Sequence, residues 1–100
     1  MIPRLVAISG SIQGQQYPVE EGKLTVGRES TNTVWLEHAS VSRRHCLIVI
    51  DGERFFISDL DSHNGTFVNR GRRLIPGTPH LLADGDEIIV GKTFLRFHII

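Results

Sequence analysis

Short apolar stretches with a two-residue period, each ended by turn-forming residues, dominate this sequence of 100 residues. Turn signals such as Asp51-Gly52 and Asp84-Gly85 lie between almost all of these stretches. No dozen residues keep the i, i+3, i+4, i+7 apolar spacing of an amphipathic helix. The pattern predicts strands over residues 4–9, 16–20, 23–26, 34–36, 45–50, 54–59, 66–68, 73–75, 80–82, 87–90 and 94–99. Many short strands at even spacing favour an all-β fold, either an antiparallel sandwich or a barrel.

Length and composition bound the kind of protein that this chain can be. With 40% hydrophobic and 22% charged residues, residues 1–100 fit one globular domain. Eleven Lys and Arg balance eleven Asp and Glu, which argues against nucleic acid or an acidic membrane as the main partner. Cys46 is the only cysteine, and neither a signal peptide nor a membrane-length apolar run occurs. We therefore expect a soluble cytoplasmic protein, or a nuclear one if the source is a eukaryote.

Two polar segments between predicted strands carry donors suited to an anion. The first runs from Gly27-Arg28 to the nearby residues 40–45, and the second covers residues 62–69. Together they gather guanidinium groups, imidazoles, serine hydroxyls and asparagine amides in predicted loops. A phosphate offers several acceptor oxygens and a double negative charge, so it requires such donors. We expect an oxyanion site on loops that the sandwich holds in place.

Each of these residues also has a purely structural interpretation when it is taken alone. Arg28 at a strand end fits a solvated surface charge, and Asn64-Gly65 is a hairpin turn signal that needs no ligand. His45 opens an apolar strand and fits a hydrogen-bonded structural histidine better than a metal ligand. The order and spacing of the motifs distinguish these interpretations from a binding site.

The motifs occur in an order that resembles the forkhead-associated (FHA) domain family. Gly-Arg at 27–28 precedes Ser-x-x-His at 42–45 and Ser-x-Asn-Gly-Thr-x-x-Asn at 62–69, and residues 84–91 resemble the family's ending. The resemblance spans nearly the whole chain. It implies a twisted antiparallel β-sandwich, here of about eleven short strands, whose loops at one end bind phosphothreonine peptides.

Carried over by motif position, the resemblance implies roles for five binding residues. Arg28 would hold the phosphate, Ser42 would donate its hydroxyl to it, and Arg43 would supply a second cation. Asn64 would hydrogen-bond the peptide main chain after the phosphothreonine. His63 stands where the family commonly has threonine, and its imidazole would contact the phosphate or wall the site. The residues that would support these loops structurally are Gly27, His45, Ser62, Gly65, Thr66 and Asn69.

The implied partner is a phosphothreonine-containing protein or peptide made by a Ser/Thr kinase. Binding would need no cofactor, metal ion or membrane, and the domain would act as a monomer in signal transduction or transcription regulation. No enzymatic activity is implied. Because the predicted fold starts at Met1, we expect an N-terminal module of a longer protein.

A hydrolase is a first alternative function. Ser42, His45 and either Asp59 or Asp61 supply the residue types of a catalytic triad. The Gly-x-Ser-x-Gly segment of hydrolase nucleophiles is absent, and Ser-x-x-His along one loop does not by itself set a nucleophile against a base.

An interaction surface made by Arg70, Arg72 and Arg73 is a second alternative. These arginines would suit nucleic acid, or a phosphate-independent interaction or dimerisation surface. Acidic residues stand close to the arginines in the sequence, and no exposed aromatic platform for stacking bases is evident.

Overall fold

The computed structural model describes residues 3–19 and 22–99 of the chain. These residues form ten strands: β1 (Pro3–Ala7), β2 (Gln16–Pro18), β3 (Lys23–Gly27), β4 (Val34–Trp35), β5 (Cys46–Asp51), β6 (Arg54–Asp59), β7 (Thr66–Val68), β8 (His80–Leu82), β9 (Glu87–Val90) and β10 (Thr93–Ile99). None of the described residues is helical, so this part of the chain contains no helix that could cross a membrane. The predicted all-β class is confirmed.

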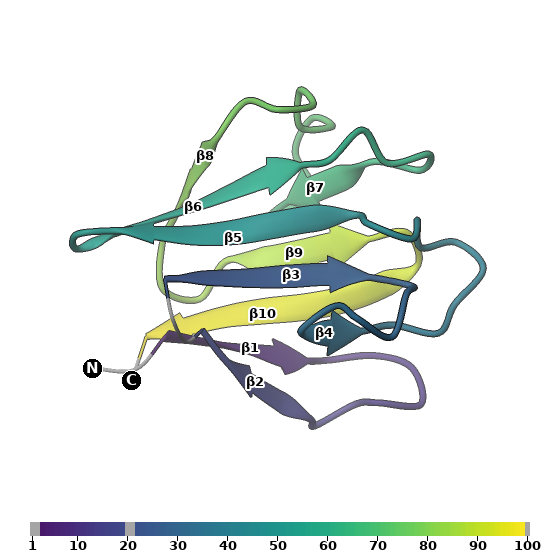
Figure 1. Cartoon of the computed structure of the whole chain (residues 1–100). Coiled ribbons are helices and arrows are strands. Elements are labelled where there is room, and N and C mark those ends of the chain that lie inside the picture. Colours follow the sequence, from purple (N-terminus) through teal and green to yellow (C-terminus); the bar gives the residue numbers. More distant parts are fainter. Residues whose placement is uncertain (1–2, 20–21, 100) are drawn as a thin grey trace.

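The strands form two five-stranded sheets that pack face to face as a sandwich (Figure 1). One sheet has the order β2-β1-β10-β9-β7, and the other has the order β4-β3-β5-β6-β8. Every strand pair is antiparallel except β3 and β4, which run parallel. The loop of residues 28–33 returns the chain before β4 begins, so the short strand β4 runs in the same direction as β3.

The predicted strand over residues 73–75 is wrong. Only one isolated bridge joins Arg73 to Phe67, and the Leu74 N–H donates to the Thr66 carbonyl (2.9 Å). This segment carries the chain from β7 in one sheet to β8 in the other, so it touches β7 and then leaves the sheet. Residue 20 of the predicted strand 16–20 lies outside the described residues.

The alternating apolar residues of both sheets meet in one core. Strand β1 shows the pattern directly, because its first, third and fifth residues are buried and the two between them are partly exposed. Phe97 on β10 is fully buried, and its ring lies 5.3 Å from that of Phe55 on β6 (centroid to centroid). Cys46 at the start of β5 is also fully buried, and this burial raises the pKa of its thiol. The thiol therefore acts as a small core group.

The register of the strands collects the polar loops at one end of the sandwich. Val26, Cys46 and Asp59 are direct neighbours across β3, β5 and β6, so these strands border the loops together. Residues 28–33, 36–45 and 60–65 and the turn between β9 and β10 all lie there, as Figure 1 shows. Strand β1 begins and β10 ends at the opposite end, where Pro3 pairs with Ile99.

We expect Phe97→Ala to lower the free energy of unfolding by about 3–5 kcal/mol, because it removes a fully buried ring and leaves a cavity beside Phe55. Urea denaturation measures the loss. Ile75→Ala is the control, since Ile75 is 70% exposed, and it should change the free energy by less than about 0.5 kcal/mol. A similar loss in both variants would contradict the assignment of the core.

Candidate functional site

Arg28 follows β3 directly and is held against the loop of residues 36–45. Its backbone N–H donates to the Ser42 carbonyl oxygen (2.9 Å), and its side-chain Nε donates to the Val41 carbonyl oxygen (3.0 Å). The side chain stays exposed, and within the described residues its guanidinium forms no ion pair. Its direction is therefore fixed by backbone carbonyls while its charge remains available to an external anion.

Gly27 allows the loop of residues 36–45 to approach the end of β3 closely, so that the Arg43 backbone lies next to it. A Cβ at Gly27 would overlap the Arg43 carbonyl oxygen and would lie 2.7 Å from Nδ2 of Asn32. The Asn32 amide cross-links the two loops, because Nδ2 donates to the Arg43 carbonyl (2.8 Å) and to the Glu29 carbonyl (2.9 Å). The Arg43 side chain is exposed and also has no ion pair among the described residues.

Residues 28–33, 36–45 and 60–65 are the first, second and third loops of the site. Ser42 in the second loop contacts His63 in the third. The Ser42 Oγ accepts a hydrogen bond from the His63 backbone N–H (3.0 Å). A serine hydroxyl carries one donor and two acceptor lone pairs, so this contact leaves the Ser42 proton free to donate. The His63 ring is exposed beside it.

Asn64 ties the third loop to the second a little further along. Its Nδ2 donates to the Ser40 carbonyl oxygen (2.8 Å), and the Ser40 Oγ accepts from the Lys92 backbone N–H (2.9 Å). Gly91, with φ +60°, leaves room for Ser40, since a Cβ there would lie 2.5 Å from the Ser40 Oγ. The turn between β9 and β10 therefore supports the loop of residues 36–45, to which Asn64 is hydrogen-bonded.

His45 is a buried link between the second and third loops. Its Nδ1 accepts from the Ser42 N–H (3.1 Å), and its Nε2 donates to the Gly65 carbonyl oxygen (2.8 Å). These contacts require the neutral ring with its proton on Nε2. Burial lowers the pKa of His45, although the Gly65 hydrogen bond and the charge of Asp59 oppose that shift.

Asp59 at the end of β6 holds the loop of residues 60–65 through its buried carboxylate. It is fully buried, and its carboxylate accepts from the Ser62 Oγ (2.5 Å), the Ser62 N–H (3.0 Å) and the Thr66 Oγ1 (2.7 Å). Burial raises the pKa of Asp59, but the hydrogen bonds from Ser62 and Thr66 outweigh that effect, and the net pKa is lowered. The Ser62 Oγ in turn accepts from the Gly65 N–H (3.0 Å), which closes the loop.

Arg73 braces the same loop from outside. Its Nη2 donates to the Ser62 carbonyl (2.6 Å) and to the His63 carbonyl (3.3 Å). Gly65 has φ +85°, and a Cβ there would lie 2.7 Å from the Arg73 Nε. The guanidinium therefore lies directly against the turn that presents Asn64.

Comparison with known proteins gives this arrangement a family. A family model of the FHA domain matches residues 24–91. The chain belongs to the FHA domain family. The FHA assignment rests on the span that contains all three loops of the site.

Individual relatives agree with this FHA assignment. The glycogen accumulation regulator GarA of Mycolicibacterium smegmatis is 34% identical over 93 residues, which cover 93% of this chain and 56% of GarA. The chain therefore spans little more than half the length of this relative. A chain studied for phosphothreonine-dependent FHA domain interactions has a TM-score of 0.86 and 34% identity, covering 100% of this chain and 98% of that one. EmbR of Mycobacterium tuberculosis, in complex with a low-affinity phosphopeptide, has a TM-score of 0.87 and 33% identity, covering 98% and 24%.

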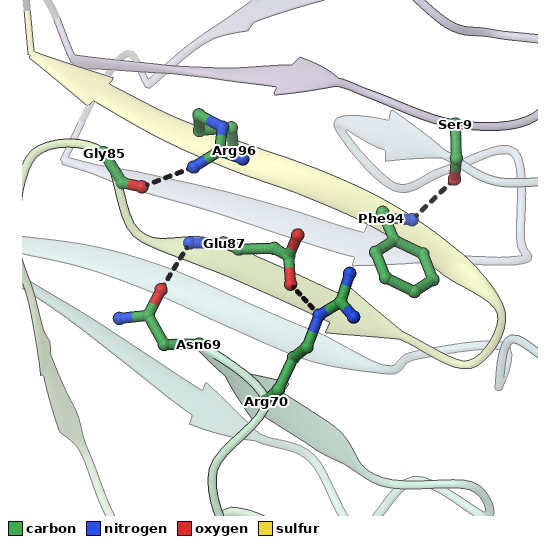
Figure 2. A network of polar contacts seen from close by, with 7 residues as sticks. All are labelled: Ser9, Asn69, Arg70, Gly85, Glu87, Phe94 and Arg96. Atoms are coloured by element: carbon green, nitrogen blue, oxygen red, sulfur yellow. Dashed lines mark hydrogen bonds and ion pairs between the residues drawn. The ribbon is translucent and has the colours of Figure 1, made fainter.

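Asn69 is the one predicted FHA site residue that lies apart from the others. It follows β7 at the end opposite Gly65, where its Nδ2 donates to Asp86 Oδ1 (2.9 Å) and its Oδ1 accepts from the Glu87 N–H (2.9 Å). Figure 2 shows Asn69 beside Arg70, whose Nε contacts Glu87 (2.9 Å) and whose guanidinium lies 5.4 Å from the centre of the Phe94 ring. Arg70 thus has a carboxylate partner, Glu87, and Arg73 has two carbonyl partners within the chain.

Sequence reasoning missed three residues that hold the FHA loops together. Asn32, Ser40 and Arg73 bridge loops through side-chain contacts with backbone groups. Only the position of Asn32 between Gly27-Arg28 and β4 carried a signal, since asparagine commonly caps turns through its side chain. The spacing of Arg73 relative to Ser62 carries no periodic signal.

We expect the free energy of unfolding to decrease as the pH is lowered below about 6.5, because the pKa of His45 is lower in the folded chain than its ordinary value of 6.5. Below that pH the unfolded chain binds a proton that the folded chain refuses, and the loss approaches about 1.4 kcal/mol per pH unit at most. Urea denaturation between about pH 5 and 7.5 measures it. His45→Gln should flatten this dependence and His98→Gln should not; equal slopes in all three proteins would disprove the role of His45.

We expect Arg73→Ala to loosen the turn of residues 62–65 and to cost about 1–2 kcal/mol, because two carbonyl oxygens lose a charged donor. Hydrogen exchange at the His63 and Gly65 amides, which donate to the Ser42 and Ser62 hydroxyls, should accelerate. Arg72→Ala is the matched control, since Arg72 is an exposed neighbour without a hydrogen bond among the described residues. Unchanged exchange in Arg73→Ala would show that the brace is not needed.

Proposed function

We propose that this FHA domain binds phosphothreonine peptides at the loop end of the sandwich. The observation that carries the proposal is the convergence of Arg28, Ser42 and Arg43 on loops that are cross-linked to one another. Neither guanidinium is paired with a carboxylate among the described residues. Two unneutralised arginines beside a serine hydroxyl match the charge and the acceptor oxygens of a phosphate.

The contacts within the site leave the right groups for the ligand. The Arg28 Nε donates to the Val41 carbonyl, so the two terminal nitrogens of the guanidinium remain free to donate to phosphate oxygens. Ser42 accepts from His63 and keeps its own proton to donate. Asn64 uses one amide hydrogen on Ser40 and keeps its Oδ1 as an acceptor for a peptide N–H. Because these groups are already held, binding a phosphate costs little reorganisation of the loops.

The phosphothreonine preference comes to this chain from its relatives. A similar chain, 34% identical, is described through phosphothreonine-dependent FHA domain interactions, and EmbR is bound to a phosphopeptide. We infer a partner phosphorylated by a Ser/Thr kinase. His63, exposed next to Ser42, would contact the phosphate or line the space beside it.

The same contacts argue for binding and against hydrolysis. Both ring nitrogens of His45 are engaged with backbone groups of Ser42 and Gly65, so the ring is not placed to take a proton from the Ser42 hydroxyl. Asp59 bonds to Ser62 and Thr66, and among the described residues neither its carboxylate nor that of Asp61 is hydrogen-bonded to the His45 ring. The nucleophile, base and orienting acid of a triad are therefore not connected.

We expect Arg28→Ala to weaken phosphothreonine-peptide binding by at least roughly thirtyfold, because a charged hydrogen-bond donor is lost from the phosphate. Trp35 provides the readout: it is the only tryptophan, it is 46% exposed, and its Nε1 donates to the Arg28 carbonyl oxygen (3.0 Å). Its fluorescence during titration should change with a phosphothreonine peptide pool, less with phosphoserine, and not with the unphosphorylated pool.

Arg54→Ala is the matched control for this titration, since Arg54 is an exposed arginine at the start of β6, away from the loops. It should bind like the wild type, and circular dichroism should show both variants folded. If the folded wild type bound no phosphothreonine pool, or if Arg28→Ala bound as tightly as Arg54→Ala, the proposed function would be wrong.

A further inference from the structure

A groove of about 570 Å³ lies on the outer face of the second sheet, next to the three loops. Thr25 on β3 and Leu47 on β5 are opposite each other in the strand register and form its floor. Thr33 lines one side, where its hydroxyl contacts that of Thr25 (3.3 Å). Lys23 and Arg44 also line it, so the groove combines hydroxyl groups, two aliphatic side chains and two cations.

Each loop of the phosphate site also contributes to this groove. The loop after Arg28 supplies Thr31 and Asn32, and Asn32 is the residue that fixes the Arg43 carbonyl. The second loop supplies Arg44, and the third supplies Leu60, whose N–H donates to the His45 carbonyl (2.9 Å). A ligand whose phosphate sits at Arg28 and Arg43 therefore has this groove as its immediate neighbour.

The charge of the groove is of one sign. Among the residues that the structure describes, no Asp or Glu lines it, and Arg44 takes part in no ion pair. Arg44 is exposed at the loop end, whereas Lys23 is the first residue of β3. Gly27 is four positions after Lys23 along β3, which corresponds to about 13 Å. An extended peptide covers that length with about four residues.

We propose that this groove binds the segment flanking the phosphothreonine and selects segments that carry a second anionic group. The inference rests on the proposed function, which it extends from the phosphate to the sequence around it. Arg44 would meet an anion near the phosphothreonine, Lys23 would meet one further away, and Leu47 and Leu60 would cover the aliphatic parts of the segment. The anion is either a carboxylate or a second phosphate, since both present oxygens to these cations.

The test measures the binding of three kinds of fluorescently labelled phosphothreonine peptide by fluorescence anisotropy, with the wild type and with three variants. One peptide has neutral flanks, one carries glutamates on a single flank, prepared for either side, and one carries a phosphoserine there. The variants are Arg44→Glu, Lys23→Glu and the matched control Arg72→Glu, which reverses an exposed arginine outside the groove. The quantity of interest is the affinity for the anionic peptide divided by that for the neutral peptide.

We expect the wild type to prefer one anionic flank by roughly three- to tenfold at low salt, and the preference should shrink as salt is added. Arg44→Glu and Lys23→Glu should each reduce the ratio to about one or below, and Arg72→Glu should keep it. A larger ratio for phosphoserine than for glutamate would identify a second phosphate as the natural anion.

Two results would overturn the groove assignment while leaving the proposed function intact. One is a wild-type ratio of one with clear binding of the neutral phosphothreonine peptide. The other is an equal reduction of the ratio by Arg72→Glu and Arg44→Glu, which would show only the long-range effect of net charge. Failure of every phosphothreonine peptide to bind would instead reject the proposed function, and the groove inference with it.

Discussion

The loop end of this domain depends on one buried imidazole. His45 accepts a hydrogen bond from the Ser42 N–H and donates one to the Gly65 carbonyl, so its buried side chain joins the two loops that carry Ser42 and Asn64. The backbone bond from the Leu60 N–H to the His45 carbonyl (2.9 Å) continues the pairing of β5 and β6, and beyond it side chains make the hydrogen bonds between these two loops among the described residues. Since the ring is fully buried and both nitrogens are used, a shift of either loop would leave an unsatisfied polar group in the core, at a cost of about 1–3 kcal/mol. Asn32, Asn64 and Arg73 add more exposed cross-links around this buried one.

The division of the arginines explains how a chain with no net charge can present a basic site. Arg70 is neutralised by Glu87, and Arg73 is committed to two carbonyl oxygens of its own chain. Arg28 and Arg43 are exposed at the loop end without a carboxylate partner among the described residues. The net charge of the chain therefore does not report the charge of the loop end, and it is this local charge that determines which ligand can bind there. Pairing some arginines internally and leaving others unpaired concentrates positive potential where an anion can reach it.

Much of the fold and of the candidate site could be read from the sequence, because both leave local patterns. Two-residue alternation predicts most strands, and the Gly27-Arg28, Ser42 and Asn64 motifs occupy short loops whose spacing reflects the strands between them. Residues 73–75 alternate like a strand but cross between sheets, and alternation cannot report that change. The support from Arg73 and Ser40, and the remote position of Asn69, depend on contacts between distant segments and on which end of β7 faces the loops. Such contacts follow from the tertiary arrangement, which has no signature in the neighbouring residues.

Recognition of a phosphate alone cannot distinguish one phosphothreonine protein from another, because the phosphate is the same group in each. In the proposed function, Arg28, Ser42 and Arg43 would supply binding energy that every such ligand shares, so discrimination would have to come from surfaces that contact the residues around the phosphothreonine. In this domain the residues that fix the phosphate loops also lead onto the outer sheet face: Asn32 holds Arg43 and lines the groove, and Arg44 follows Arg43 directly. The contact of Asn32 with Arg43 thus also fixes the position of the groove relative to the proposed phosphate site. A flanking anion bound there would gain from being tethered to an already bound phosphate, so even weak, solvent-exposed charge contacts could rank one ligand above another.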